Sequence, residues 1–165
     1  MKTSTLRGII YLAGGIGLLV AIFAAAEFYE ASLRGVCSIN QFFSCARVDQ
    51  SGLTTTFGVQ DYLWGVGGFI VLLIVAGIAE SRPRDVRPAY LLSLLATGAV
   101  ALSAYFIYLQ VAVIHALCVV CLTAESFGTL LWVASIGLAI RTRRKASGKD
   151  RPQGQSPAPA GSDRA

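Results

Sequence analysis

The longest stretch of this chain without a charged side chain runs from Pro88 to Ala124, and it restricts what the chain can fold into. His115 is its only basic residue. An α-helix rises ~1.5 Å per residue and a bilayer core is ~30 Å thick, so about 20 apolar residues make one crossing. The stretch is therefore too long for one crossing and must fold back, and the polar residues Gln110 and His115 mark the expected turn.

Two shorter uncharged runs, from Gly8 to Ala26 and from Tyr62 to Ala79, are each long enough for one crossing. With 55% hydrophobic and 14% charged residues, the 165-residue chain is also far more apolar than an ordinary soluble domain. We therefore predict an all-α fold for residues 1–140, an integral membrane four-helix bundle with a long loop between its first two helices. The spans are expected at about 8–26, 62–79, 88–114 and 116–140.

A cleaved signal peptide is the alternative for the first run, because Lys2 and Arg7 precede it and three alanines, Ala24 to Ala26, end it. Signal sequences usually have an apolar region of only about 7 to 15 residues. The longer run in this chain favours an uncleaved first span.

The basic residues indicate the orientation of the bundle. Placing the N-terminus in the cytoplasm puts 12 of the 14 basic residues inside, and only Arg34 and Arg47 fall outside, in a loop that also carries acidic residues. By the positive-inside rule, both termini are expected in the cytoplasm and this loop on the extracytoplasmic side. The inside residues are Lys2, Arg7, Arg82, Arg84, Arg87, Arg141, Arg143, Arg144, Lys145, Lys149, Arg151 and Arg164.

The remaining segment, residues 141–165, is basic, rich in Pro, Gly and Ser, and poor in large apolar side chains. Such a composition cannot bury a core, so we expect a disordered cytoplasmic tail. The net charge of +5 follows the membrane ends and forms no basic face with interleaved aromatic residues, which argues against nucleic-acid binding.

All four cysteines are expected at the extracytoplasmic boundary. Cys37 and Cys45 lie in the outer loop, and Cys118 and Cys121 open the fourth helix, which starts at the same side. Cys118 and Cys121 share a helix face in a C-x-x-C arrangement typical of dithiol redox sites. The positive end of the helix dipole favours a thiolate at Cys118, and the thiolate is the reactive form in disulfide exchange.

Two other uses of these cysteines are disfavoured. An inert staple within one helical turn would close almost no loop and add little stability. A four-thiolate zinc site is disfavoured because seven residues separate Cys37 from Cys45, where common zinc modules have two to four. Four cysteines allow three pairings, and the sequence does not choose among them.

Several of these motifs resemble the vitamin K epoxide reductase family, in particular its bacterial and archaeal members that support disulfide formation. The spacing of Cys37 and Cys45, a serine at Ser51, and the C-x-x-C from Cys118 to Cys121 match the family pattern in the same order. The resemblance covers about residues 8–140 and includes Gly58, Gly65 and the segment Tyr105-Phe106-Ile107-Tyr108.

The resemblance implies a membrane thiol oxidase of a prokaryotic plasma (inner) membrane that needs no metal. A separate thioredoxin-like disulfide oxidase would pass electrons to Cys37 and Cys45, then to Cys118 and Cys121, and finally to a membrane quinone of the menaquinone, ubiquinone or vitamin K type. By family analogy Cys45 attacks Cys118, and Cys121 meets the quinone. The tail is too short and too polar to hold a fused thioredoxin-like domain, so the partner is expected in trans.

Three more residues are candidates. Glu125 lies four residues past Cys121, on the same helix face, and could bind a quinone oxygen or only a neighbouring helix. Asp61 stands where vertebrate family members carry a quinone-binding asparagine, or serves only as a helix N-cap. Ser51 could assist exchange between the cysteine pairs or be only a turn residue. His115 is expected to be merely solvated.

The cysteine pattern leaves two rival interpretations of the function. Disulfide bond formation protein B catalyses the same net reaction, but it places its C-x-x-C in the first outer loop and its widely spaced pair in the second, the reverse of this chain. A membrane scaffold stapled by disulfides is the non-enzymatic rival, in which all four cysteines would stay oxidised.

Overall fold

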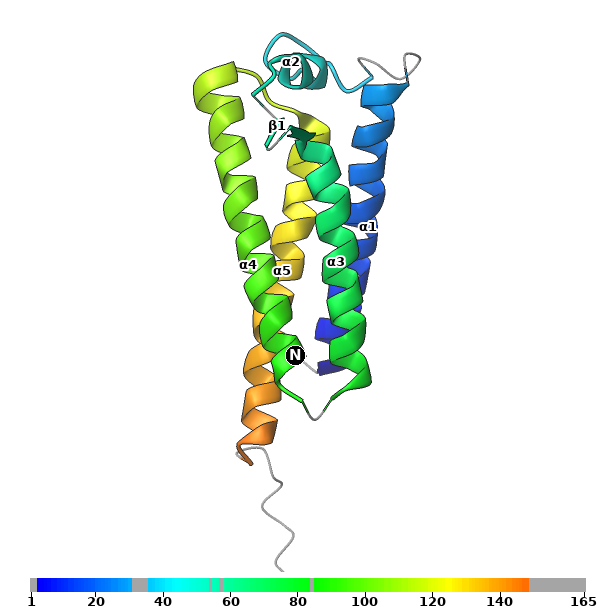
Figure 1. The fold of residues 1–165 in the computed structure, drawn as a ribbon, viewed down its shortest axis with the longest axis vertical. Helices are drawn as coiled ribbons and strands as arrows, with labels where there is room; N and C mark the ends of the chain where they lie inside the picture. The colour runs from blue at the N-terminus through cyan, green and yellow to red at the C-terminus, as the bar shows by residue number, and fades with distance from the viewer. Residues whose placement is uncertain (1–2, 31–35, 54, 57, 84, 149–165) are drawn as a thin grey trace, which may run out of the picture.

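Four long helices make up most of the chain (Figure 1). The computed structural model describes residues 3–30, 36–53, 55–56, 58–83 and 85–148. All four helices are long and apolar enough to cross a membrane. The predicted all-α membrane four-helix bundle is therefore confirmed. The helices are α1 (Thr3–Tyr29), α3 (Asp61–Ser81), α4 (Arg87–Tyr108, continued by the π-helix η1, Leu109–Ile114) and α5 (Val119–Ala146).

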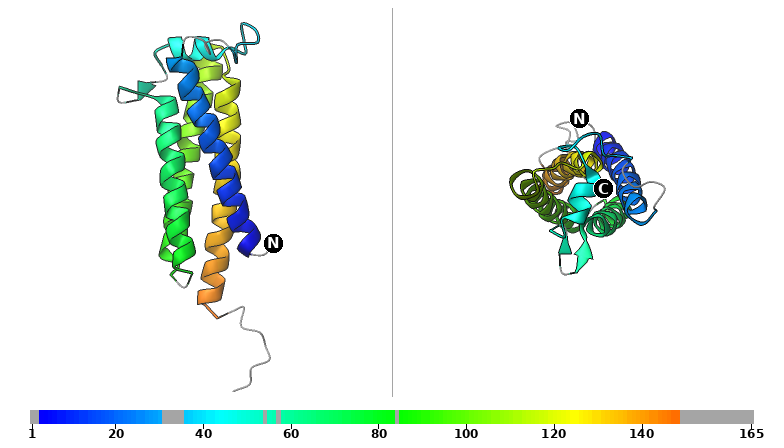
Figure 2. Two further views of the ribbon diagram at one scale, coloured as in Figure 1. Left: turned by 90° about the vertical axis from the view of Figure 1, so that its right-hand side faces the viewer. Right: turned by 90° about the horizontal axis from the view of Figure 1, so that it is seen from above.

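The helices form a ring in which α1 and α4 each pack against both α3 and α5. Seen from above, they surround a common centre (Figure 2). Successive helices run in opposite directions, so the first and last described residues lie at the same end of the bundle (Figure 1). The connection between α1 and α3 therefore lies at the other end, which we call the cysteine end because it carries Cys37, Cys45, Cys118 and Cys121.

Small side chains let α1 and α3 approach closely. A Cβ atom at Gly14 would lie 2.7 Å from Leu73 Cδ2, and one at Gly17 would overlap the ring of Phe69. The buried core around this contact includes Ile10, Leu72 and Leu131. Large apolar side chains also cover the outside of the bundle, as expected for helices in lipid.

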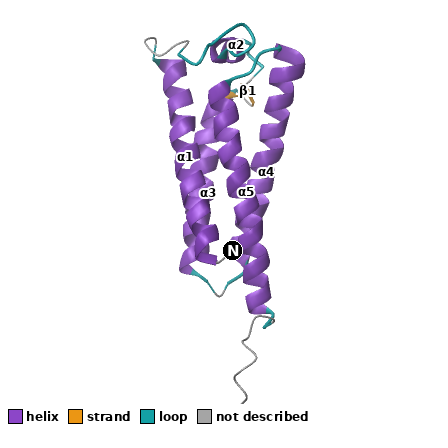
Figure 3. Cartoon of the chain, turned by 180° about the vertical axis from the view of Figure 1, so that it is seen from behind, coloured by secondary structure: helices purple, strands orange, loops and turns teal. Residues whose placement is uncertain are grey.

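A short helix lies across the cysteine end, and a small hairpin lies beside it (Figure 3). The helix is α2 (Cys45–Gln50), and the hairpin pairs β1 (Thr55–Thr56) with β2 (Val59–Gln60) in antiparallel fashion. Between the strands, Gly58 adopts a positive φ of 78°, which glycine tolerates without a Cβ clash.

The helix ends differ from the predicted spans. The fourth helix begins at Val119 rather than at residue 116, because Leu117 pairs with Phe43 in a parallel β-bridge. It also continues to Ala146, so residues 141–146 are helical although we expected them in the tail. Arg and Lys are good helix formers and are favoured at a helix C-terminus. Residues 149–165 of the predicted tail lie outside the described residues.

Candidate functional site

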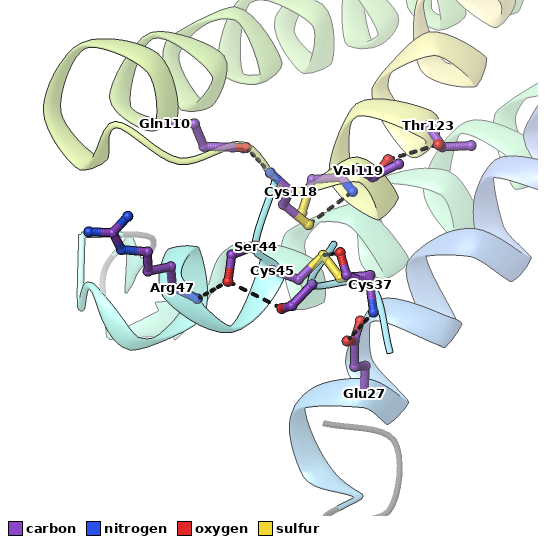
Figure 4. Close-up of a disulfide and its surroundings, with 11 residues drawn as sticks. Glu27, Cys37, Ser44, Cys45, Arg47, Gln110, Cys118, Val119 and Thr123 are labelled. Atoms are coloured by element: carbon purple, nitrogen blue, oxygen red, sulfur yellow. Dashed lines mark hydrogen bonds between the residues drawn. A yellow bond between two sulfur atoms is a disulfide. The ribbon is translucent and has the colours of Figure 1, made fainter. Parts of the chain in front are cut away.

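A disulfide joins Cys37 to Cys45 at the cysteine end, with the two Cα atoms 5.9 Å apart (Figure 4). Cys45 opens α2 and is only 2% exposed, whereas Cys37 is half-buried. Ser44 caps α2 by accepting a hydrogen bond from the Arg47 N–H at 3.4 Å. The structure thus gives the two loop sulfurs different access to solvent.

Cys118 occupies the N-cap position of α5. Its Sγ accepts a hydrogen bond from the Cys121 N–H at 3.2 Å, and its side chain is 2% exposed. The Cys118 sulfur thus satisfies one of the N–H groups that the first turn of α5 leaves without a partner inside the helix.

Three sulfur atoms meet at this end of the bundle. The Sγ atoms of Cys37, Cys45 and Cys118 all lie within 4.8 Å of one another. The loop and the fourth helix are therefore close enough for disulfide exchange with only a small movement. Sulfurs this close could also bind a soft metal ion, but only after the disulfide had been reduced.

Backbone hydrogen bonds hold the loop against the start of α5. The Leu117 N–H donates to the Phe42 carbonyl at 2.7 Å, and the Ser44 N–H donates to the Leu117 carbonyl at 3.0 Å. Both bonds lie next to a cysteine, Cys45 on one side and Cys118 on the other. These two hydrogen bonds therefore set the separation between the two cysteine pairs.

Gln110 supports Cys118 from the π-helix. Its side chain is fully buried, and its Oε1 accepts a hydrogen bond from the Cys118 N–H at 2.8 Å (Figure 4). Its Nε2 has no hydrogen-bond partner among the described residues. Sequence reasoning used Gln110 only to place the turn, which His115 completes with a left-handed φ of 56°.

Glu27 supports the other cysteine pair from the end of α1. Its side chain is 5% exposed, and its Oε1 accepts a hydrogen bond from the Cys37 N–H at 3.2 Å. Sequence reasoning counted Glu27 only among the charges of the outer loop. The available signal was a carboxylate directly after an apolar span, which is costly to bury without a partner.

A cavity of about 130 Å³ lies between the helices beside the cysteine end. Cys121, Glu125 and Asp61 all line it, together with mostly apolar side chains such as Phe69 and Phe106. Glu125 Oε2 is buried and has no hydrogen-bond partner among the described residues. Three of the predicted site residues thus face one cavity.

Asp61 is the first residue of α3, and Gln60 is the N-cap, so the alternative of Asp61 as the N-cap is wrong. Its Oδ1 accepts a hydrogen bond from the Tyr62 N–H at 2.7 Å. Ser51 caps the C-terminus of α2, where its Oγ donates to the Val48 carbonyl at 2.7 Å. The hydrogen bonds of Ser51 stay within this turn, and none of those described reaches a cysteine.

Comparison with known protein families gives one match. The model of the vitamin K epoxide reductase family matches residues 8–136, which is well over half of the chain and includes all four cysteines. No curated protein sequence matches the chain.

Proposed function

The chain belongs to the vitamin K epoxide reductase family, and from this premise we propose that it is a quinone-dependent thiol oxidase that supports disulfide formation. Its family is one of quinone-linked membrane oxidoreductases, and its four apolar helices make it a multi-pass membrane protein. Three further points are part of this proposal: the electron donor, the order in which the cysteines react, and the orientation of the bundle in the membrane.

One observation carries the proposal. The sulfurs of Cys37, Cys45 and Cys118 lie within 4.8 Å of one another, while Cys121 lines a cavity inside the bundle. Electrons can therefore enter at the loop pair and leave at the cavity. Because Cys121 lies within the first turn of α5 and lines this cavity, it is the cysteine that we expect a lipid-borne oxidant to approach.

In the proposed first step, the dithiol of a thioredoxin-like protein reduces the disulfide between Cys37 and Cys45. The donor becomes a disulfide, and two electrons and two protons pass to the loop pair. Cys37 is the more exposed of the two sulfurs, so it is the one that we expect the donor to attack.

In the second step, the Cys45 thiolate attacks the sulfur of Cys118 in a disulfide between Cys118 and Cys121. A bond forms between Cys45 and Cys118, and Cys121 leaves as a thiolate. Cys37 then attacks Cys45, which restores the loop disulfide and leaves Cys118 and Cys121 reduced.

In the last step, the reduced pair passes two electrons and two protons to the quinone, which becomes a quinol as the Cys118–Cys121 disulfide forms again. The cavity of about 130 Å³ is smaller than the ~300–1,000 Å³ of typical ligand pockets, so it would hold a quinone ring and leave the isoprenoid tail in lipid. Glu125 and Asp61 are proposed to hydrogen-bond the quinone oxygens. The buried Glu125 Oε2, which has no partner among the described residues, supports this role.

The orientation is also part of the proposal. The positive-inside rule supports both termini in the cytoplasm of a prokaryote, which would place the cysteine end on the extracytoplasmic side. Disulfides form and persist in that compartment, so a thiol oxidase would act there.

A reconstituted reaction tests the function. Purified protein is mixed with a reduced thioredoxin-like protein and a quinone, and quinone reduction is followed by absorbance. We expect Cys45→Ser and Cys121→Ser to abolish the reaction, while Ser51→Ala keeps it because Ser51 makes only local hydrogen bonds. A quinone-linked rate that survives in Cys121→Ser would remove this residue from the terminal step.

A further inference from the structure

A second cavity, of about 480 Å³, lies between α4 and α5 at the end of the bundle opposite the cysteines. Two arginines, Arg143 and Arg144, line it together with three hydroxyl side chains. Its remaining lining is apolar. The hydroxyl residues are Tyr90, Ser93 and Ser147.

The two arginines have no carboxylate partner among the described residues. The one ion pair found there joins Arg7 Nη1 to Glu80 Oε1 at 3.7 Å, between α1 and α3. Two guanidinium groups beside hydroxyl donors form a site that attracts an anion, and arginine matches the geometry of phosphate oxygens.

The position of the arginines along α5 corresponds to the level of lipid headgroups. Arg143 lies 22 residues after Cys121, which is roughly 33 Å at ~1.5 Å per residue, close to the ~30 Å of a bilayer core. If Cys121 lies near one boundary, Arg143 lies near the other. Tyr90, in the first turn of α4, is at the same end.

The apolar part of the cavity continues onto the outer surface of both helices. Tyr90 is exposed and is followed one turn later by the exposed Leu94 on α4, while Ile140 and Val133 are exposed two turns apart on α5. An acyl chain could therefore lie along this surface while a phosphate met the arginines. Basic pockets between membrane helices are known to hold anionic headgroups.

We propose that this cavity binds one anionic phospholipid, with its phosphate at Arg143 and Arg144 and its acyl chains between α4 and α5. The proposal concerns the end of the bundle away from the cysteines and does not depend on the reaction at the cysteine end.

The test compares two charge-matched variants. Arg143→Gln/Arg144→Gln removes the two cavity arginines, and Arg82→Gln/Arg141→Gln removes two arginines at the same end that do not line the cavity. Binding of phosphatidylglycerol and phosphatidylcholine to the purified protein is measured by native mass spectrometry. We expect the first variant to lose roughly 25-fold in phosphatidylglycerol affinity, at about fivefold for each arginine, and the second to change little.

A third variant, Ser93→Phe, fills the cavity without changing charge, and we expect it to lose the bound lipid as well. Equal losses in the two arginine variants would show that only surface charge attracts the lipid and would overturn the proposal. Displacement of phosphatidylglycerol by an equal concentration of inorganic phosphate would also overturn the proposal, because the apolar wall of the cavity would then contribute nothing to lipid binding.

Discussion

Gln110 shows what a single buried side chain does for the reactive thiols. Its Oε1 accepts the Cys118 N–H at 2.8 Å in a fully buried position. A buried donor that loses its partner costs about 1–3 kcal/mol. We therefore expect Gln110→Leu to lower the free energy of unfolding by that amount and to slow quinone reduction about tenfold, which corresponds to ~1.4 kcal/mol in the barrier.

Gln110→Glu is the matched control, because it keeps a side-chain oxygen at the same number of bonds from the backbone. Its quinone reduction rate should lie well above that of Gln110→Leu. Both rates come from the reconstituted reaction, and thermal unfolding gives the stability. A wild-type rate in Gln110→Leu would show that the bond to Cys118 does not position the thiol.

The burial of the loop cysteines predicts which of them reaches Cys118. Cys45 is 2% exposed, whereas Cys37 is half-buried. In Cys37→Ser, Cys45 can attack Cys118, but the Cys37 thiol that resolves the product in the forward direction is missing, so a disulfide between Cys45 and Cys118 should accumulate. Mass spectrometry of peptides under non-reducing conditions detects it.

Cys45→Ser is the control for this assignment, because the Cys37 sulfur also lies within 4.8 Å of Cys118. More mixed disulfide in Cys45→Ser than in Cys37→Ser would assign the attack to Cys37 instead.

At the scale of single residues, the sequence identified those that react through their own side chains. The four cysteines carry their reactivity in their own side chains, and the membrane topology already put them at one end. Gln110 and Glu27 were missed as site residues because their roles depend on the backbone N–H groups that the folded loop brings to them.

At the scale of helices, the contact between α1 and α3 depends on Gly17. A methyl group there would overlap the ring of Phe69, which also lines the cavity beside Cys121. Overpacking costs about 1–3 kcal/mol. We expect Gly17→Ala to lower thermal stability accordingly and to raise the KM for quinone, because the ring must move toward the cavity.

Gly15→Ala is the matched control on the same helix, since a Cβ atom there has nothing within 4 Å. It should leave stability unchanged or raise it by about 0.5–1 kcal/mol, because alanine favours a helix over glycine. Equal effects of the two substitutions would contradict the close packing of α1 and α3.

Helix existence could be predicted from uncharged length, but helix ends could not. The start of α5 depends on the β-bridge between Phe43 and Leu117, which joins segments far apart in the sequence. The π-helix before His115 likewise depends on burying Gln110. Hydropathy contains no information about the β-bridge or about the burial of Gln110.

At the scale of the whole molecule, the sequence predicted four spans and their directions but not which helices are neighbours. That order depends on small residues such as Gly14 and Gly17, which allow α1 to approach α3. The same packing leaves a cavity beside Cys121, which no single helix could reveal.

The orientation of the bundle gives a last prediction. Single reporter cysteines are placed in a variant with all four native cysteines changed to serine, at Val36→Cys beside the loop disulfide and at Ser81→Cys at the opposite end of α3. Both positions are exposed and uncharged, so neither change alters the basic residues that set the orientation. A membrane-impermeant maleimide should label Val36→Cys in intact cells and Ser81→Cys only after permeabilisation. The reason is that the bilayer, with a core ~30 Å thick, separates the two positions. Labelling of both from outside would contradict a spanning bundle, and the reverse pattern would put the cysteine end in the cytoplasm, where thioredoxin and glutathione keep thiols reduced.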